Sequence, residues 1–145
     1  MEDIIVSTDK SKLDFSLIHK YISEDSYWAK GIPIEIVKKS IENSLCFGIY
    51  KGDKQVGFAR MMTDKATFAY LADVFILPEH RKQGLSKKLM SEIIAHPDLQ
   101  GLRKILLATA DAHGLYRQFG FKELEKPQNF MEKKFEYNYG GKQVK

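Results

Sequence analysis

The stretch from Leu71 to Met90, LADVFILPEHRKQGLSKKLM, limits the possible folds of this chain more than any other. An apolar strand reaches Pro78, a basic turn containing Gly84 follows, and an amphipathic helix begins directly after the turn. The first turn of a helix presents unpaired backbone N–H groups and the positive end of the helix dipole, so it attracts anions. A glycine beside it lets a ligand approach the backbone closely. We therefore expect a phosphate-bearing ligand to dock on the turn formed by Arg81, Lys82, Gln83, Gly84, Leu85 and Ser86.

A basic turn with a glycine can also be a plain turn, in which Gly84 only allows the bend and the neighbouring lysines face solvent. Two other phosphate-binding motifs are excluded, because the chain lacks GxxxxGKS/T and the turn holds too few glycines for GxGxxG. The formal charge of +4 and the pI of about 9.0 favour an anionic ligand without identifying it. The ligand therefore has to be inferred from the surrounding sequence.

Hydrophobic periodicity predicts a domain that mixes helices and strands. The length of 145 residues suits one domain, and no repeat, low-complexity tract or Pro/Gly-rich linker divides it. Apolar residues three and four apart predict helices that begin near Leu13, Pro33, Leu85 and Ala112. Their order among the strands indicates a sheet that is largely antiparallel at its start. The predicted strands cover residues 4–6, 45–50, 56–62, 67–77, 105–109, 121–124 and 130–135.

Two motifs resemble those of the GNAT superfamily of N-acetyltransferases. RKQGLS at residues 81–86 resembles the acyl-CoA pyrophosphate signature Q/R-x-x-G-x-G/A, with Ser86 where the family prefers Gly or Ala. The second half of the family pattern follows as AHGLYRQFGF at residues 112–121. The resemblance extends over roughly residues 45–125 and is looser toward the N-terminus. It implies a single GNAT domain over residues 1–145, of the α/β (α+β) class, with a mixed, mostly antiparallel central sheet of about six or seven strands flanked by about four helices.

The resemblance also implies roles for the strand before the turn. In GNAT proteins this strand splays from its neighbour, and its backbone pairs with the pantetheine arm of the acetyl donor, acetyl-CoA. By position, this implies Val74, Phe75 and Ile76 in this chain, with a backbone N–H as the oxyanion donor. Such contacts need no polar side chain, so these residues can belong to the core as well.

Tyr116 is the candidate catalytic acid. It stands in YRQFGF, which matches the family pattern Y-x-x-x-G-F, and the tyrosine of that pattern commonly protonates the departing CoA thiolate. A phenol with a pKa of about 10 can pass a proton to a thiolate of similar basicity at little cost. The alternative is a helix tyrosine that packs its ring on the core and keeps its hydroxyl in water.

The group that accepts the amine proton stays open between Asp73 and His113. Asp73 interrupts an apolar strand beside the expected thioester position, where it could act through a water or hold a cationic substrate. His113 lies near Tyr116 in the sequence, and its imidazole is a common general base. A structural role at a helix start is an equal alternative. The segment YLADVFI also resembles the YLEDFF-type strand of polyamine acetyltransferases, but Ala72 replaces the glutamate that serves as base there.

The amine acceptor is expected at the loop between the first two helices, which usually lines the acceptor pocket in the family. In this chain the loop contains Tyr27 and Trp28, the only tryptophan, beside the acidic residues Glu24 and Asp25. Aromatic rings with acidic neighbours could bind an amine by stacking or cation–π contact, with Asp73 as a further contact. A hydrophobic plug between the helices is the alternative.

The sequence argues against a secreted, a membrane-spanning and a nucleic-acid-binding protein. Cys46 is the only cysteine, so an internal disulfide is impossible and nothing argues for secretion. The sequence shows no charged-then-apolar leader, no apolar run near the ~20 residues of a membrane span and no nucleic-acid-binding module. We therefore expect a cytoplasmic protein with no membrane, nucleic-acid or metal partner. A homodimer is left open, because dimers are common in the superfamily.

The sequence thus favours an N-acetyltransferase that moves an acetyl group from acetyl-CoA to a primary amine of a small molecule or peptide. Direct transfer in a ternary complex is expected, because Cys46 lies far in sequence from the thioester position and an acetyl-cysteine intermediate is disfavoured. The second hypothesis is a non-catalytic GNAT-fold module that binds acyl-CoA or a protein, since Ala72 supplies no carboxylate.

Overall fold

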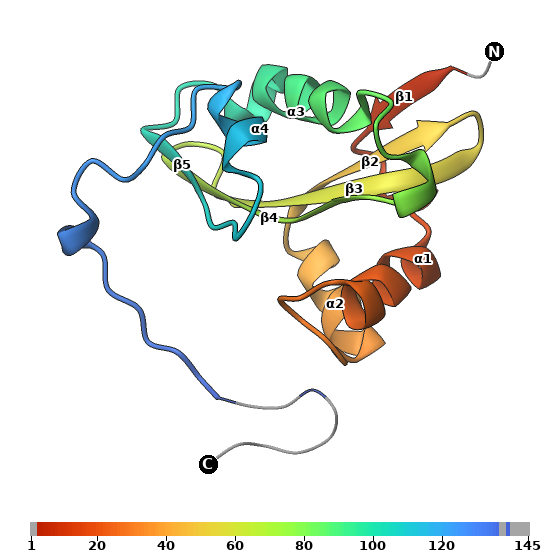
Figure 1. Ribbon diagram of the computed structural model, residues 1–145, viewed down its shortest axis with the longest axis horizontal. Coiled ribbons are helices and arrows are strands. Elements are labelled where there is room, and N and C mark those ends of the chain that lie inside the picture. The colour runs from red at the N-terminus through yellow and green to blue at the C-terminus, as the bar shows by residue number, and fades with distance from the viewer. Residues whose placement is uncertain (1–2, 137–138, 140–145) are drawn as a thin grey trace.

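The computed structural model describes residues 3–136 and Tyr139, and it contains one five-stranded sheet with helices on both faces (Figure 1). The strands follow each other across the sheet in chain order. Neighbours are antiparallel from the first to the fourth strand, and the fifth is parallel to the fourth. The strands are β1 (Ile4–Ser7), β2 (Leu45–Lys51), β3 (Lys54–Thr63), β4 (Phe68–Ile76) and β5 (Lys104–Leu107).

The helices form two layers, with α1 and α2 on one face of the sheet and α3 and α4 on the other (Figure 1). The α-helices are α1 (Phe15–Lys20), α2 (Ile34–Glu42), α3 (Leu85–Ala95) and α4 (His113–Arg117). A short π-helix, η2 (Tyr21–Asp25), continues α1 directly. The remaining helical turns are η1 (Lys10–Lys12), η3 (Pro78–His80), η4 (Pro97–Leu99) and η5 (Pro127–Asn129).

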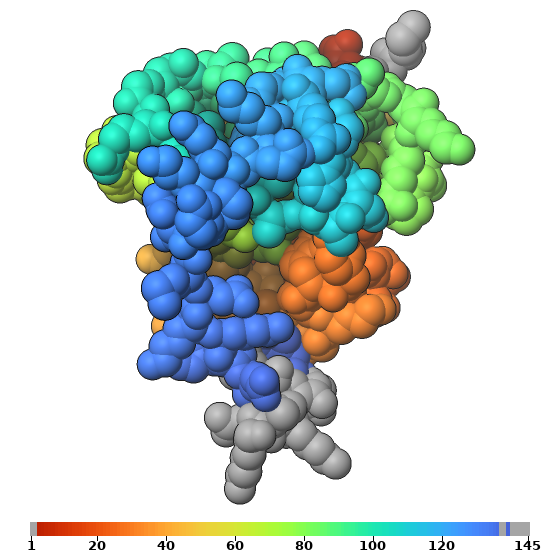
Figure 2. Space-filling view, turned by 60° about the vertical axis from the view of Figure 1, so that its left-hand side comes forward, coloured from red at the N-terminus to blue at the C-terminus, as the bar shows by residue number. Residues whose placement is uncertain are grey.

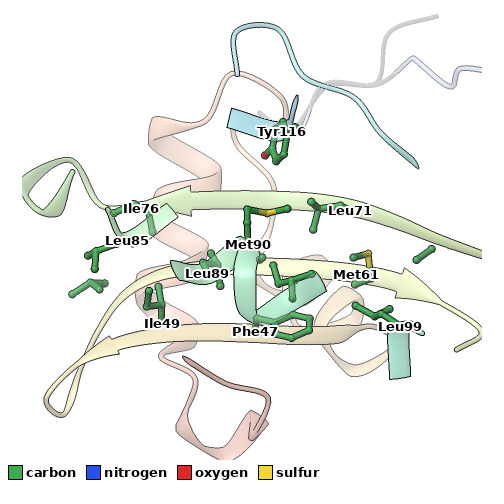
Figure 3. Close-up of a cluster of buried hydrophobic side chains, with 14 residues drawn as sticks. Phe47, Ile49, Met61, Leu71, Ile76, Leu85, Leu89, Met90, Leu99 and Tyr116 are labelled. Atoms are coloured by element: carbon green, nitrogen blue, oxygen red, sulfur yellow. The ribbon is translucent and has the colours of Figure 1, made fainter. Parts of the chain in front are cut away.

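Because helices cover both faces, the central strands bury both rows of side chains. On the face of α3, Phe47 and Met61 pack with the buried side of that helix (Figure 3). On the face of α1 and α2, Cys46 and Phe58 belong to a second buried cluster. Cys46 and Phe47 are adjacent on β2 but point to opposite faces, as successive residues of a strand do. Leu71 and Ile76 of β4 belong to the first cluster and Phe75 to the second, so β4 is packed on both of its faces.

The mixed, mostly antiparallel architecture and the four α-helices in the described part of the chain confirm the fold class expected from the sequence. Local signals account for the element starts. Asp14 caps α1 by accepting a hydrogen bond from the N–H of Leu17 (3.0 Å), and Pro33 precedes the first residue of α2. The expected domain covers residues 1–145, of which 1–2, 137–138 and 140–145 lie outside the described residues. None of the described helices is long and apolar enough to cross a membrane.

The expected number of six or seven strands is wrong, because the sheet has five strands among the described residues. The sequence pattern predicted strands at 121–124 and 130–135, but the structure forms no strand there. After α4 the chain leaves the body of the molecule (blue in Figure 1), and every residue from 125 to 136 is exposed. A β-strand requires a neighbour that accepts and donates its backbone hydrogen bonds, and in the part of the chain that the structure describes these segments have no such neighbour.

Candidate active site

β4 and the edge strand β5 separate partway along β4. Their parallel pairing runs from Phe68 opposite Lys104 to Leu71 opposite Leu107, where β5 ends while β4 continues to Ile76. Beyond Leu71 no described strand flanks β4 on this side. Backbone N–H and C=O groups on a free strand edge can pair with an extended ligand. The structure thus brings Val74, Phe75 and Ile76, the residues expected to pair with the pantetheine arm, to the open part of the strand.

A β-bulge lies where the strand opens. Phe58 pairs with Phe75 and Arg60 pairs with Ala72, so two residues of β4, Asp73 and Val74, stand opposite one residue of β3. Asp73 has a φ of +54°, a left-handed conformation that aspartate adopts more readily than most residues. Bulges of this kind turn a side chain out of the regular alternation. Here the bulge directs the Asp73 carboxylate toward groups on two other elements, which are described next.

Each carboxylate oxygen of Asp73 accepts a hydrogen bond. The indole Nε1–H of Trp28 donates to Oδ1 over 2.8 Å, and the guanidinium Nε–H of Arg60 donates to Oδ2, also over 2.8 Å. Arg60 in turn donates from its terminal nitrogen to the hydroxyl of Ser44 (3.2 Å). The side chains of the ion pair are only 15% and 12% exposed, so solvent screens it weakly. Asp73 is therefore a fixed carboxylate that holds Trp28 in place.

Arg60 is a site residue that the sequence analysis missed. It is the only charged residue in the run from Gln55 to Met62, just as Asp73 is the only charged residue in β4. Two lone opposite charges on adjacent antiparallel strands are a signal for an ion pair. The two charges alone did not identify the pair, because the bulge shifts the register between β3 and β4 and thereby determines which residue of β4 faces Arg60.

The loop between η2 and α2 closes over the gap between β4 and β5. The backbone N–H of Ala110 donates a hydrogen bond to the hydroxyl of Tyr27 (3.0 Å), and the ring of Tyr27 meets Trp28 edge-on with centroids 5.1 Å apart. Figure 2 shows the orange atoms of this loop against the blue-green atoms that follow β5. Tyr27 and Trp28 are 59% and 41% exposed, so they do not form the alternative hydrophobic plug. The structure thus brings together the predicted acceptor residues Tyr27, Trp28 and Asp73.

The turn between β4 and α3 presents unpaired amides. Gly84 is the residue before α3, and its φ of +77° places it in the left-handed region that favours glycine. The first N–H of the helix with a backbone partner is that of Lys88, which donates to the carbonyl of Gly84 (3.1 Å). In the described part of the chain no acceptor faces the amides of Leu85, Ser86 and Lys87. A Cβ added to Gly84 would meet no atom within 4 Å, so the space beside the turn is open to a ligand.

The side chain of Arg81 donates hydrogen bonds to other groups of the protein. Its Nε–H donates to the carbonyl of Ile76 (3.0 Å), and its terminal nitrogen donates to the hydroxyl of Tyr21 (2.8 Å). The Tyr21 ring stacks on Phe75 with centroids 4.0 Å apart. Arg81 therefore ties the turn to β4 and η2, and its backbone N–H also bonds within the protein, to the carbonyl of Pro78 (3.3 Å). The side chains of Lys82 and Gln83 are exposed.

Tyr116 lies at the edge of the larger core cluster, above β4 in Figure 3, and is 8% exposed. Its ring contacts Phe121 edge-on, with centroids 5.9 Å apart. Burial, with a smaller influence of Tyr27 and Asp111, raises the pKa of Tyr116 to about 12. The side chain is therefore a protonated donor at neutral pH. The match with a thiolate that we expected from an ordinary phenol is not present in the ligand-free protein, because the higher pKa makes complete proton transfer uphill.

His113 and Cys46 have different environments. His113 is the first residue of α4, one turn before Tyr116, and its side chain is exposed. Cys46 is 1% exposed on β2, and burial raises the pKa of its thiol to about 11. A buried, protonated thiol is a poor nucleophile.

Among the described residues, no three His, Cys, Asp or Glu side chains gather closely enough to hold a metal ion.

Two open hollows elsewhere on the surface have volumes of about 490 and 480 Å³. Lys12, Asp14 and Gln55 line the first, and Asn43, Ser44 and His96 are among those lining the second. Neither hollow includes the free edge of β4, the turn or Tyr116. The candidate site is therefore an open strand edge that continues into a helix start.

Comparison with protein families agrees with this geometry. Residues 42–123 match the family described as the acetyltransferase (GNAT) domain. A relative from Gibberella zeae, named as a candidate acetyltransferase, is 33% identical over 83% of this chain and 80% of its own length. A second relative, from Gracilaria tenuistipitata var. liui, is named an uncharacterised N-acetyltransferase and is 29% identical over 73% of this chain and 69% of its own.

Solved structures show the same fold. A candidate acetyltransferase of the GNAT family from Xanthomonas campestris pv. campestris is 54% identical, covers 97% of each chain and superposes with a TM-score of 0.90. A more distant acetyltransferase from Clostridium acetobutylicum, solved with acetyl-CoA, is 13% identical, has a TM-score of 0.64 and covers 92% of this chain and 96% of its own. At that identity the likeness concerns the fold alone. From the family match and the close structural relative, this chain belongs to the GNAT family of acetyltransferases.

Proposed function

We propose that the protein is an N-acetyltransferase that moves an acetyl group from acetyl-CoA to a primary amine, directly and in a ternary complex. One observation carries this proposal. The free edge of β4 beyond Leu71 leads into the turn at Arg81–Ser86, whose helix amides are unpaired. An extended amide-containing arm that ends in a diphosphate is complementary to such a path, because it pairs first with strand backbone and then with helix N–H groups.

The residues present fit this donor. Acetyl-CoA supplies an acyl group activated as a thioester. Val74, Phe75 and Ile76 offer backbone groups to the arm, and the amides from Gly84 to Ser86 offer donors to the diphosphate. Lys82, Lys87 and Lys88 add positive charge around the turn, where their exposed side chains reach an anion through solvent. A backbone N–H at the bulge stabilises the negative charge that develops on the thioester oxygen.

The transfer forms a C–N bond and breaks a C–S bond. The amine enters beside Tyr27 and Trp28, whose exposed rings attract a cation, and the paired carboxylate of Asp73 adds negative potential. The amine loses a proton through water to Asp73 or to the exposed His113. Tyr116 keeps its proton at neutral pH, donates a hydrogen bond to the departing sulfur, and gives up the proton as negative charge accumulates there.

The buried thiol of Cys46 supports direct transfer rather than a covalent acetyl-enzyme. Its low exposure keeps it from a substrate carbonyl, and its raised pKa keeps it protonated. The amine and the thioester therefore have to be bound at the same time. In steady-state kinetics, this mechanism gives intersecting rather than parallel double-reciprocal lines.

Isothermal titration with acetyl-CoA, followed by thiol-release assays over a library of primary amines, tests the proposal. Binding of acetyl-CoA together with amine-dependent thiol release supports it, and failure to bind acetyl-CoA refutes it. The alternative is a module that binds acyl-CoA or a protein without transfer, which Ala72 and the fully paired Asp73 favour. Binding of acetyl-CoA without thiol release for any amine would decide for this alternative.

A further inference from the structure

Tyr21 joins two parts of the site that lie far apart in the sequence. It is the first residue of η2 and is 8% exposed. Its ring stacks on Phe75 of β4 with an interplanar angle of 10°, and its hydroxyl accepts the hydrogen bond from Arg81. Tyr21 thus contacts both the strand that is expected to pair with the pantetheine arm and the turn that is expected to receive the diphosphate.

The backbone of Tyr21 supports residues 26–33, which are called the acceptor loop below. The N–H of Ser26 donates to the carbonyl of Tyr21 over 3.0 Å, at the point where η2 ends. The hydroxyl of Ser26, a residue that is 1% exposed, donates to the carbonyl of Ile22 (2.6 Å) and accepts from the N–H of Ala29 (3.2 Å). These bonds attach the loop to η2 on both sides of its two aromatic residues, so the position of η2 determines where those rings lie.

The turn at Arg81–Ser86 is held at its beginning and open at its end. The guanidinium of Arg81 is fixed between the carbonyl of Ile76 and the hydroxyl of Tyr21. The amides that begin α3 have no acceptor in the described part of the chain. A diphosphate bound to these amides therefore restrains the turn from the end that the protein itself leaves free.

We propose that Tyr21 is a positioning residue that couples the two substrate sites, so that a donor bound at the turn immobilises the acceptor loop through Arg81 and η2. The proposal rests on the function proposed above. A ligand that restrains one part of a protein lets a second ligand bind with a smaller loss of conformational entropy. The donor therefore prepares the acceptor loop for the amine, and by thermodynamic reciprocity an amine on the loop strengthens binding of the donor.

Trp28 reports on the acceptor loop, because it is the only tryptophan and is 41% exposed. CoA is the probe, since it carries the diphosphate and the pantetheine arm without an acetyl group to transfer. Acrylamide quenching of the Trp28 fluorescence should fall when CoA saturates the parent. Isothermal titration of each variant gives the CoA concentration that is needed for saturation.

Tyr21→Phe is the test variant, because it keeps the ring on Phe75 and removes the hydroxyl that accepts from Arg81. At saturating CoA the fall in Trp28 quenching should be lost. Arg81→Lys tests the same contact from the other side, since an ammonium does not reproduce the two hydrogen bonds of the guanidinium fork. This variant should also lose the response to CoA.

Tyr50→Phe is the matched control. Tyr50 is also buried, at 6% exposed, but its hydroxyl has no hydrogen-bond partner among the described residues. Removing that hydroxyl should leave the response of Trp28 to CoA as it is in the parent. Thermal melts establish that all the compared variants are folded.

Three results would overturn the coupling and leave the proposed function in place. Unchanged Trp28 quenching in the CoA-saturated parent shows that the loop does not respond to the donor. A response that persists in CoA-saturated Tyr21→Phe shows that CoA shields Trp28 without the Tyr21 hydroxyl. A response that is lost equally in Tyr50→Phe is not specific to Tyr21. A parent that does not bind CoA at all refutes the proposed function and the coupling together.

Discussion

Replacing Gly84 by valine separates the two properties of the phosphate turn, its backbone conformation and its access to a ligand. Gly84 has a φ of +77°, and a Cβ at this position meets no protein atom within 4 Å. The substitution should therefore cost folding stability through backbone strain alone, about 1–2 kcal/mol for an L-residue in the left-handed region. The new side chain projects into the open space where the diphosphate is expected.

The loss of affinity should be larger than the loss of stability. A hydrogen bond to a charged group contributes about 1.5–3 kcal/mol, so blocking one amide–phosphate contact weakens acetyl-CoA binding by about tenfold to a hundredfold. Isothermal titration measures the affinity of the folded variant, and a thermal melt confirms that it is folded. Gly84→Ala should fall between valine and the parent.

Gly101→Val is the matched control. Gly101 has a φ of +76° and equally open space around its Cβ, so its valine variant has the same strain. It lies in the connection before β5, outside the turn. The two valine variants should lose similar stability, and only Gly84→Val should lose affinity. If Gly84→Val binds acetyl-CoA as tightly as the parent, or if both variants lose affinity equally, the assignment of the turn is wrong.

Three further predictions concern Tyr116 and Asp73. Tyr116→Phe should keep acetyl-CoA affinity and lower kcat by roughly 10²-fold or more, the usual share of general acid catalysis, and an unchanged kcat would remove Tyr116 from the mechanism. Because folding raises the pKa of Tyr116 to about 12, the stability that this group contributes is complete below the unfolded pKa of about 10 and is lost as pH rises from there toward 12. Urea titrations in this alkaline range should therefore show a steeper loss of stability for the parent than for Tyr116→Phe, and equal slopes would contradict the shift. Asp73→Ala should shift the fluorescence of Trp28, the only tryptophan, to longer wavelength, while Asp73→Asn, which keeps the acceptor for the indole N–H, should not. The exposed Glu79→Ala is the control, and identical spectra for all three variants would show that Asp73 does not hold Trp28.

Five of the seven predicted strands, the turn and the short helix that carries Tyr116 could be predicted because their signals are local. Alternating apolar residues mark β2 and β3, and Pro78 and Gly84 mark the turn within a few residues of its place in the structure. Each of these signals depends on neighbours in the sequence. The elements that carry the candidate site could therefore be located from the sequence.

What escaped prediction depends on contacts distant in the sequence. Arg60 faces Asp73 only because a bulge shifts the register between β3 and β4. Arg81 was expected in the turn that receives the phosphate, but the sequence did not indicate that its side chain reaches Tyr21, sixty positions earlier. The raised pKa of Tyr116 follows from burial that the motif does not encode.

The predicted strand at 130–135 shows a different limit. The segment was interpreted as a strand, but the structure forms none there, because apolar side chains do not supply the hydrogen-bonding neighbour that a strand requires. In the described part of the chain that neighbour is missing, so the segment is extended without belonging to the sheet. Secondary structure at an exposed edge thus depends on which other surface is present.

The loop with Tyr27 and Trp28 contacts the rest of the site through a small number of side-chain atoms. One hydrogen bond joins Tyr27 to the backbone before α4, and one joins Trp28 to Asp73 at the bulge. The free edge of β4 and the turn use backbone atoms of other segments. Under the proposed function, a change in this loop alters the amine side of the site and leaves in place the backbone atoms that receive the donor, so exchange of a single loop can change the acceptor.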